Sequence, residues 1–597
     1  MPTYQAPVRD MQFLFQDVLE LEQFSNLEGF RDATPDVMNA ILEEGAKLTQ
    51  EVLFPLNQVG DQQGCNRRQD GGVETPDGFK DAYDTYCEGG WGGLTADPAY
   101  GGQGLPHVLG VAVSEMMSSS NMAFGMYPGL TRGAYAAISL HGTDTQKETY
   151  LPKLVSGQWT GTMNLTEPHC GTDLGMLRTK AVPQADGSYK ITGTKIFISA
   201  GEHDLAENII HLVLARIEGA PEGTKGISLF IVPKFILNED GTPGERNGVM
   251  CGSLEEKMGI HGNSTCVMNY DDAVGYLIGA EHKGLRAMFT MMNEARLGVG
   301  IQGLAQSEIA YQNAAAYAKD RIQGRALTGA QNPDKPADPI LVHPDVRRML
   351  MNQRAFNEAA RAMLFWTALF GDLSEKATDE KLREKGEDYM GLMTPVLKAY
   401  LTDMGFTHCV NAQQVYGGHG YIQEWGMEQY VRDSRIAMIY EGANGIQALD
   451  LVGRKLALNG GRAVTTFLAE INQYIDERRD DPEMGTFVEG LETAKSHLEE
   501  GTAWLMKNGL EDFNNAGAAS TDYLYIFGLV GMAYMWARMA EAAQKKLNNG
   551  GASDPFYATK LKTGRYFIER MLPDTAAHLA KLKTGAEPLM AMTADEF

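Results

Sequence analysis

The hydrophobic period of this chain changes twice along its length, which limits the folds available to it. Three short segments are rich in β-branched and aromatic residues and are bounded by Gly, Pro or Asp: GSYKITGTKIFISAG (187–201), NIIHLVLARIEG (208–219) and GISLFIVPKF (226–235). Such segments are typical of strands, and the Asp-Gly pair before the first indicates a hairpin. Stretches with helical spacing lie on both sides. The order predicts a helical region, a β-rich domain and a second helical region.

The helical spacing is clearest in three stretches, PDVMNAILEEGAKLTQEVLFPLNQVGD (35–61), VRRMLMNQRAFNEAARAMLFWTALF (346–370) and TPVLKAYLTDMGFTHCVNAQQVYGG (394–418). Residues 328–344 are expected to form a loop, and the highly charged residues 371–388 to form a solvated connection. The apolar run Ile526–Trp536 is too short to span a bilayer and is expected to pack in a bundle.

With 597 residues the chain exceeds one compact core, so several domains are expected. We expect an α+β multidomain fold in four parts. These are an N-terminal helical domain with an N-terminal extension (1–158), a middle β-barrel-like domain (159–280), a C-terminal four-helix bundle (281–461) and an additional helical domain (462–597).

Charge and cysteine usage argue against several classes of function. The net charge of -25 disfavours binding to nucleic acid or to anionic membrane surfaces. No apolar run is long enough for a transmembrane span, and the N-terminus lacks the apolar core of a secretory signal. The six cysteines are scattered without a CxxC pair, and no HExxH is present. We therefore expect no disulfide framework, no metal site and a cytoplasmic location.

Three segments carry candidate chemistry. MNLTEPHCGTDL (163–174) combines hydroxyl groups with glycine before the first strand, and NAQQVYGGHGY (411–421) has a Gly pair that lets a backbone approach a ligand closely. Glu441 stands between the mostly apolar RIAMIY and a Gly-Ala-Asn-Gly turn. Taken singly, each has a plain alternative: a structural loop, a helix-ending turn and a solvated turn residue.

Together these segments resemble the acyl-CoA dehydrogenases over most of residues 35–460. The similar pieces occur in the order of the family: GWGGL and PAYGGQG, LTEPHCGTD, GTKIFISAGE, NEARLGVGIQGLAQ, DRIQGR, VYGGHGY and VRDSRIAMIYEGANGIQ. The resemblance implies FAD held between a β domain and a helical bundle, with a neighbouring subunit completing the site. It implies a homodimer, or a dimer of dimers, and an electron-transfer flavoprotein as electron acceptor.

The resemblance also implies site residues, carried over position by position. Those that match flavin contacts are Met163, Leu165, Thr166, Thr172, Phe197, Ile198, Ser199, Arg321, Gln323, Gln414, Val415, Gly417 and Gly418. Those that match acyl-CoA contacts are Thr172, Arg296, Tyr440 and Gly442, and Glu441 matches the catalytic base.

The resemblance places Arg321 and Gln323 near the FAD pyrophosphate across the dimer, where a guanidinium suits phosphate oxygens. A surface salt bridge is the alternative for Arg321, and a structural ion pair is the alternative for Arg296. Many relatives have Trp and Thr where this chain has Phe197 and Ser199, so the aromatic face and the hydroxyl are both retained.

The segment after Glu441 departs from the family. Relatives usually read Gly-Thr after the acid, and many carry a polar Gln two residues beyond that pair; this chain has Gly442-Ala443 and Gly445. Any flavin contact at positions 443 and 445 must therefore use the backbone.

Glu441 fits the chemistry that this resemblance implies. Dehydrogenation at Cα–Cβ of a thioester needs a base for the α-proton, and a hydride acceptor that no side chain provides. Free Glu, with a pKa of about 4.3, is a weak base for a carbon acid, but a dry apolar setting raises its basicity. Apolar neighbours such as Ile439 and Tyr440 agree with such a setting.

The chain is longer than ordinary family members, and its length, N-terminal segment and acidic helical tail look most like the extended 3-methylmercaptopropionyl-CoA dehydrogenases. That resemblance implies oxidation of 3-methylmercaptopropionyl-CoA to 3-methylthioacryloyl-CoA in dimethylsulfoniopropionate metabolism. A general medium- or long-chain acyl-CoA dehydrogenase of fatty-acid oxidation is the first alternative. An acyl-CoA oxidase and a flavoprotein that binds nucleic acid through its C-terminal block are further alternatives, and the acidity of that block argues against the last.

Overall fold

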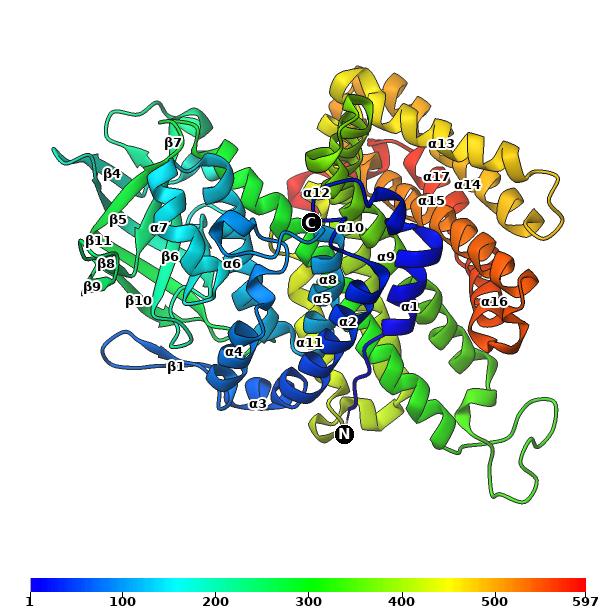
Figure 1. The fold of residues 1–597 in the computed structure, drawn as a ribbon. Helices are drawn as coiled ribbons and strands as arrows, with labels where there is room; N and C mark the ends of the chain where they lie inside the picture. Colours follow the sequence, from blue (N-terminus) through cyan, green and yellow to red (C-terminus); the bar gives the residue numbers. More distant parts are fainter. Residues whose placement is uncertain (1) are drawn as a thin grey trace. The chain divides into compact units, whose positions relative to one another are not determined.

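The computed structural model describes residues 2–597, except for the side chain of Ala552. The chain forms two compact units, drawn in Figure 1. Unit 1 contains the chain up to Glu43, Pro106–Glu115 and Val299–Phe597, and unit 2 contains Glu44–Leu105 and Met116–Gly298. Unit 2 holds the β-rich region and unit 1 is helical, which confirms the predicted α+β class.

The main sheet of unit 2 has seven strands, β3 (Trp159–Asn164), β4 (Lys180–Pro183), β5 (Tyr189–Ser199), β6 (Asn208–Ile217), β7 (Ile227–Pro233), β10 (Val249–Leu254) and β11 (Thr265–Ile278). They follow the order β10-β11-β5-β4-β6-β3, and β7 pairs with both β11 and β6. The strands β11, β5, β4, β6 and β7 therefore form a closed ring, which confirms the predicted β-barrel-like domain.

The three strands predicted from the sequence are β5, β6 and β7. The predicted hairpin joins β4 to β5 with Pro183 opposite Tyr189, and Gly187 supplies the positive φ of its turn, 86°. Apolar residues such as Ile191, Val213 and Phe230 fill one core of the ring. On the other side, α6 (Met122–His141) and α7 (Asp144–Val155) pack against β3.

Three helices dominate the middle of unit 1: α9 (Pro344–Lys376), α10 (Glu380–Val415) and the unit 1 part of α8 (Gly284–Asp320). The expectation of a solvated connection over 371–388 was wrong, because only 377–379 interrupt the helices. The charges in this stretch pair instead with the C-terminal block: Lys385 Nζ lies 2.6 Å from Glu470 and Asp388 lies 2.6 Å from Arg462 Nε.

The C-terminal block is helical, as predicted, with α13 (Arg462–Arg478), α14 (Gly485–Trp504), α15 (Phe513–Asn548), α16 (Pro555–Arg570) and α17 (Asp574–Leu582). Its longest helix, α15, packs on the bundle: Trp536 Nε1 donates to the Ala355 carbonyl at 3.1 Å. Gly528 allows a close approach, since a Cβ there would lie 2.7 Å from the Tyr400 ring. Within residues 2–597 no helix is long and apolar enough to cross a membrane.

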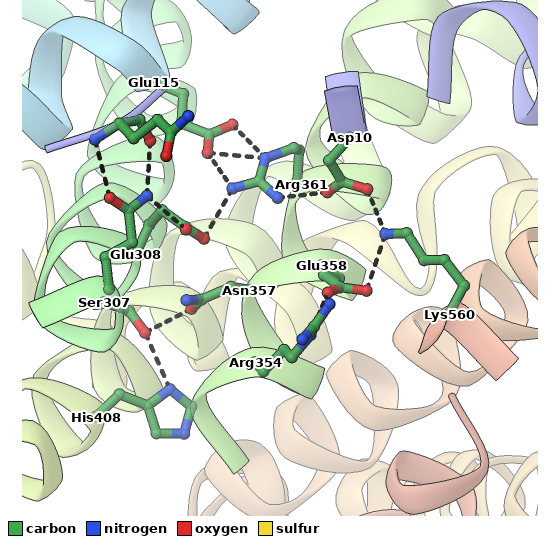
Figure 2. Close-up of polar contacts among 12 residues, drawn as sticks. Asp10, Glu115, Ser307, Glu308, Arg354, Asn357, Glu358, Arg361, His408 and Lys560 are labelled. Atoms are coloured by element: carbon green, nitrogen blue, oxygen red, sulfur yellow. Dashed lines mark hydrogen bonds and ion pairs between the residues drawn. The ribbon is translucent and has the colours of Figure 1, made fainter. Parts of the chain in front are cut away.

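Unit 1 also contains a buried charge cluster, shown in Figure 2, which joins distant parts of the chain. Its members are Asp10, Glu115, Glu308, Arg354, Glu358, Arg361 and Lys560. Arg361 lies 2.6 Å from Glu115 and 3.0 Å from Glu308, and it also pairs with Asp10. Lys560 of α16 pairs with Asp10 of α1 (Val8–Phe13) and lies 2.8 Å from Glu358.

Candidate active site

Glu441 occupies the bend between η11 (Ile436–Met438) and α12 (Asn444–Asp450) in unit 1. Its backbone is left-handed, with φ of 57°, and the next residue, Gly442, has φ of 87°. For a non-glycine residue this conformation costs on the order of 1–2 kcal/mol and persists only when neighbouring contacts enforce it. Such strain concentrates at functional sites, so the backbone supports a special role for Glu441.

Buried polar side chains hold this bend. Lys398, a fully buried residue of α10, donates from Nζ to the Gly442 carbonyl and to Asn444 Oδ1, each at 2.8 Å. Gln447 Nε2 lies 3.2 Å from the carbonyl oxygens of both Glu441 and Gly442. These bonds fix the peptide groups on both sides of Gly442. We call residues 439–444 the Glu441 turn.

Tyr440, which precedes Glu441, was expected to be an apolar neighbour of the acid, but its hydroxyl group makes a hydrogen bond. Its hydroxyl donates to Gln302 Oε1 on α8, in the unit 1 part of that helix. Burial, and next the charge of Glu441, raises the pKa of Tyr440. Ile439, the other expected apolar neighbour, is half exposed. Glu441 itself is only partly buried.

Two further predicted groups lie together at one end of the helices of unit 1. Arg321 and Gln323 follow the end of α8, and Gly417 and Gly418 follow the end of α10. Tyr317 of α8 stacks on Tyr416 with ring centroids 4.1 Å apart, which joins the two helix ends.

The backbone at these helix ends is open to a ligand. Arg321, Gln323, Gln414, Gly417 and Gly418 are not buried, and a Cβ at either glycine would meet nothing within 4 Å. Val415, by contrast, is buried. Asp338 organises the loop after Arg321 by accepting from the N–H groups of Ala326, Gln331 and Asn332.

In unit 2 the structure brings the segment after β3 against the end of β5. The N–H of Ile196 donates to the Thr166 carbonyl at 2.9 Å, and the Thr162 hydroxyl donates to the Ser199 carbonyl at 2.7 Å. Phe197 between them has φ of 59° and a 60% exposed side chain, while Ile198 is buried. Met163 is buried at the strand end. An exposed aromatic face therefore stands beside Leu165, Thr166 and Ser199.

Lys195 and Glu167 fix this arrangement, and their charges were not recognised from the sequence. The fully buried Lys195 donates to the Leu165 carbonyl at 2.9 Å and to Glu167 Oε1 at 2.8 Å. Burial alone would raise the pKa of Glu167, but Lys195 and hydrogen bonds from Thr179 and the Arg178 N–H hold it below its usual value. Glu167 therefore has a structural hydrogen-bonding role in this loop.

One group in the described part of the chain has metal-ligating atoms close together: those of Glu167, His169 and Cys170 lie within 4.8 Å of one another. Both oxygens of the Glu167 carboxylate accept hydrogen bonds from the protein, Oε1 from Lys195 and Thr179 and Oε2 from the Arg178 N–H.

The predicted substrate residues are divided between the two units. Arg296 of α8 is buried in unit 2 with 7% exposure, and Thr172 is exposed on the loop after β3. Tyr440 and Gly442 belong to the Glu441 turn in unit 1. Lys398 and Asn444 were missed from the sequence, although a lone Lys in the apolar stretch TPVLKAYL is a recognisable signal of a buried partner.

The residues present fit FAD in their chemistry. A flavin ring needs an apolar or aromatic face with polar groups at its edge, and unit 2 offers exposed Phe197 beside Thr166 and Ser199. A pyrophosphate needs cations and accessible N–H groups, and unit 1 offers exposed Arg321 and the open Gly417-Gly418 backbone.

Four family models match this chain in succession: acyl-CoA dehydrogenase N-terminal domain (66–158), middle domain (162–273) and C-terminal domain (282–456), then an acetyl-CoA dehydrogenase C-terminal-like domain (467–593). The chain is 41% identical to the 3-methylmercaptopropionyl-CoA dehydrogenase of Ruegeria pomeroyi over 98% of its own length and 99% of that protein. It is 34% identical to a butyryl-CoA dehydrogenase of Syntrophomonas wolfei over 100% and 99% of the two chains. A Bacillus anthracis acyl-CoA dehydrogenase solved with FAD shares the fold, with 22% identity, a TM-score of 0.75 and coverage of 93% and 89%.

Proposed function

We propose, for a chain that belongs to the acyl-CoA dehydrogenase family, that Glu441 is the base that removes the α-proton of an acyl-CoA thioester. Family membership makes the protein an FAD-dependent oxidoreductase that acts on acyl-CoA. The observation that carries the assignment of the base is the left-handed backbone of Glu441, held by Lys398 and Gln447.

The residues of the chain account for the proton half of the reaction. The Glu441 carboxylate accepts the proton from Cα, and the electron pair of that C–H bond forms the Cα=Cβ double bond. FAD, when bound, accepts the hydride that leaves Cβ. The fixed turn holds the backbone from which the Glu441 side chain projects, which lowers the entropic cost of reaching the α-proton.

The flavin and substrate contacts are proposed from family membership, one group of residues at a time. Phe197, Ile198 and Ser199, with Met163, Leu165, Thr166 and Thr172, are proposed to line the flavin ring. Arg321 and Gln323, with the Gln414–Gly418 backbone, are proposed to hold the pyrophosphate side. Arg296, Tyr440 and Gly442 are proposed to contact the acyl-CoA. The exposed aromatic face and the open glycine backbone support these proposals.

Glu441→Gln tests the proposed base, because the amide keeps the shape and hydrogen-bonding reach of the carboxylate but cannot accept a proton at neutral pH. Flavin binding should persist, and the rate of flavin reduction by acyl-CoA should fall on the order of 100- to 10,000-fold in stopped-flow measurements. Glu424→Gln, which changes an exposed acid close in sequence, is the matched control and should react normally. A fall of less than about tenfold for Glu441→Gln would move the base elsewhere.

The proposed substrate is 3-methylmercaptopropionyl-CoA, with 3-methylthioacryloyl-CoA as product, in dimethylsulfoniopropionate metabolism. Identity over nearly the full length to a protein of that name supports it. Comparing kcat/KM for this thioester with butyryl-, octanoyl- and palmitoyl-CoA tests the choice. A higher value for butyryl-CoA would favour the alternative of straight-chain fatty-acid oxidation, as in the Syntrophomonas relative.

The assembly and the electron acceptor are further proposals. We expect a homodimer, or a dimer of dimers, because the flavin contacts implied by the family come from neighbouring subunits. An electron-transfer flavoprotein is the proposed acceptor, and peroxide release in air would instead indicate an oxidase. A cytoplasmic location is supported by the six free cysteines, all in the described residues.

A further inference from the structure

A continuous series of hydrogen bonds connects the C-terminal block to the Glu441 turn within unit 1. The Tyr525 hydroxyl of α15 donates to Asp403 Oδ2 at 2.8 Å, and Asp403 Oδ1 accepts from Asn444 Nδ2 at 2.7 Å. Asn444 in turn accepts from Lys398, which also donates to the Gly442 carbonyl next to Glu441. Three side chains, those of Asp403, Asn444 and Lys398, therefore link Tyr525 of α15 to the Gly442 carbonyl.

The orientation of Asn444 depends on this series. Its amide nitrogen donates to Asp403 Oδ1 and also to the Thr402 hydroxyl at 2.9 Å, while its amide oxygen faces Lys398. Asn444 is the first residue of α12, so these bonds tie the start of that helix to α10. A carboxylate at Asp403, rather than an amide, requires the nitrogen of Asn444 to point toward it, which leaves the oxygen for Lys398.

Tyr525 is well placed to hold Asp403. Its ring packs edge-on against Tyr400 of α10 and against His578 of α17, at 5.5 and 5.1 Å between centroids. His578 is itself fixed by Asp522, 2.7 Å from its Nδ1. The phenol therefore has little freedom, and its hydroxyl stabilises one carboxylate rotamer of Asp403.

We infer that Tyr525 of the C-terminal block is a positioning residue for the proposed base, acting through Asp403, Asn444 and Lys398 on the Glu441 turn. This inference rests on the proposed function of Glu441. It gives the block after the bundle an indirect part in the reaction: α15 sets the geometry of the turn as well as covering the bundle. Tyr525 lies in the region matched by the separate C-terminal-like model, beyond the match of the bundle domain.

Tyr525→Phe is the test, since it removes the hydroxyl and keeps the ring packing. Tyr523→Phe is the matched control, because Tyr523 is fully buried on the same helix. Its hydroxyl makes a 2.8 Å hydrogen bond with the Thr502 hydroxyl and not with Asp403. In holoenzyme, Tyr525→Phe should lower the limiting rate of flavin reduction about threefold to tenfold through misplacement of the base. KM and flavin content should stay within about twofold of wild type, and Tyr523→Phe should leave all three unchanged.

Amide hydrogen exchange followed by mass spectrometry gives a readout independent of activity. Tyr525→Phe should speed exchange in peptides covering 436–450 and leave peptides of α9 unchanged. Faster exchange throughout unit 1, or a rate of flavin reduction equal to that of Tyr523→Phe, would overturn the inference. Adding Tyr525→Phe to Glu441→Gln should lower flavin reduction no further, because the group being positioned is gone.

The failure of this inference and that of the proposed base can be told apart. If Glu441→Gln retains the wild-type rate of flavin reduction, the proposed base is wrong, whatever Tyr525→Phe does. If Glu441→Gln loses the rate while Tyr525→Phe behaves like Tyr523→Phe, only the positioning role is wrong.

Discussion

Lys560→Met should destabilise unit 1 by about 3 kcal/mol. Lys560 is 2% exposed and bonds to the carboxylates of Asp10 and Glu358. Removing it deletes two charge-assisted hydrogen bonds of roughly 1.5–3 kcal/mol each. The loss is limited because Asp10 keeps Arg361 and Glu358 keeps Arg354, so neither carboxylate is left without a cation.

The surroundings of Lys560 reduce the loss further. Its ammonium lies 5.4–5.8 Å from the ring centroids of Phe13, Trp536 and Phe556. A Met side chain packs well against such rings, and the desolvation of a buried ammonium is no longer needed. These gains offset part of the two lost bonds, which brings the expected loss to the lower half of their sum.

Urea denaturation followed by circular dichroism measures the change, with Lys583→Met as the control. Lys583 belongs to the same C-terminal block and lies 2.5 Å from Glu500, but both side chains are about half exposed. Exposed pairs of this kind contribute little to stability, so Lys583→Met should unfold with wild type. If Lys560→Met unfolds at the same urea concentration as Lys583→Met, the argument from burial is refuted.

Two further outcomes are expected from unit 1. Burial raises the pKa of Glu115 from 4.5 to about 7, so its carboxyl group binds a proton more tightly in the folded state than in the unfolded state. The free energy of unfolding should therefore fall as pH rises from about 4.5 to about 7. Glu115→Gln should reduce that fall in urea denaturation across the same pH range, and an unchanged slope would contradict the assignment. Deleting the chain after residue 461 should cause aggregation in sedimentation assays, because the faces of α9 and α10 that α15 covers, at Ala355 and Tyr400, become exposed; a soluble and active truncation would contradict this.

The residue pattern within short segments was sufficient to predict strands of the main sheet. The segments 208–219 and 226–235, rich in β-branched and aromatic residues and bounded by turn residues, placed β6 and β7 correctly. Strand β11 was missed because Asp271 and Asp272 interrupt its apolar residues, and these acids are exposed on the sheet. Residues 371–388 were assigned to a solvated connection because they are highly charged. The assignment was wrong because some of these charges pair with α13, and no local pattern shows those partners.

The candidate site divides in the same way. Glu441 could be found because an acid next to a glycine turn, in a familiar order of motifs, is visible in the sequence. The residues that hold it could not, because Lys398, Asp403 and Tyr525 are separated from the turn by tens of residues and meet it only through helix packing. The division into residues 1–158, 159–280, 281–461 and 462–597 stays a prediction.

The bond between Asp10 and Lys560 joins residues 550 positions apart, and this has a consequence for the growing chain on the ribosome. Every segment of unit 2 has been synthesised once Gly298 is made, so that unit can begin to fold at that point. At roughly 5–20 residues per second, the remaining residues take on the order of 15 to 60 seconds to appear. Arg361 appears early in that interval, but Lys560 appears only near its end, so the N-terminal helix waits for its α16 partner until nearly the last helix is translated.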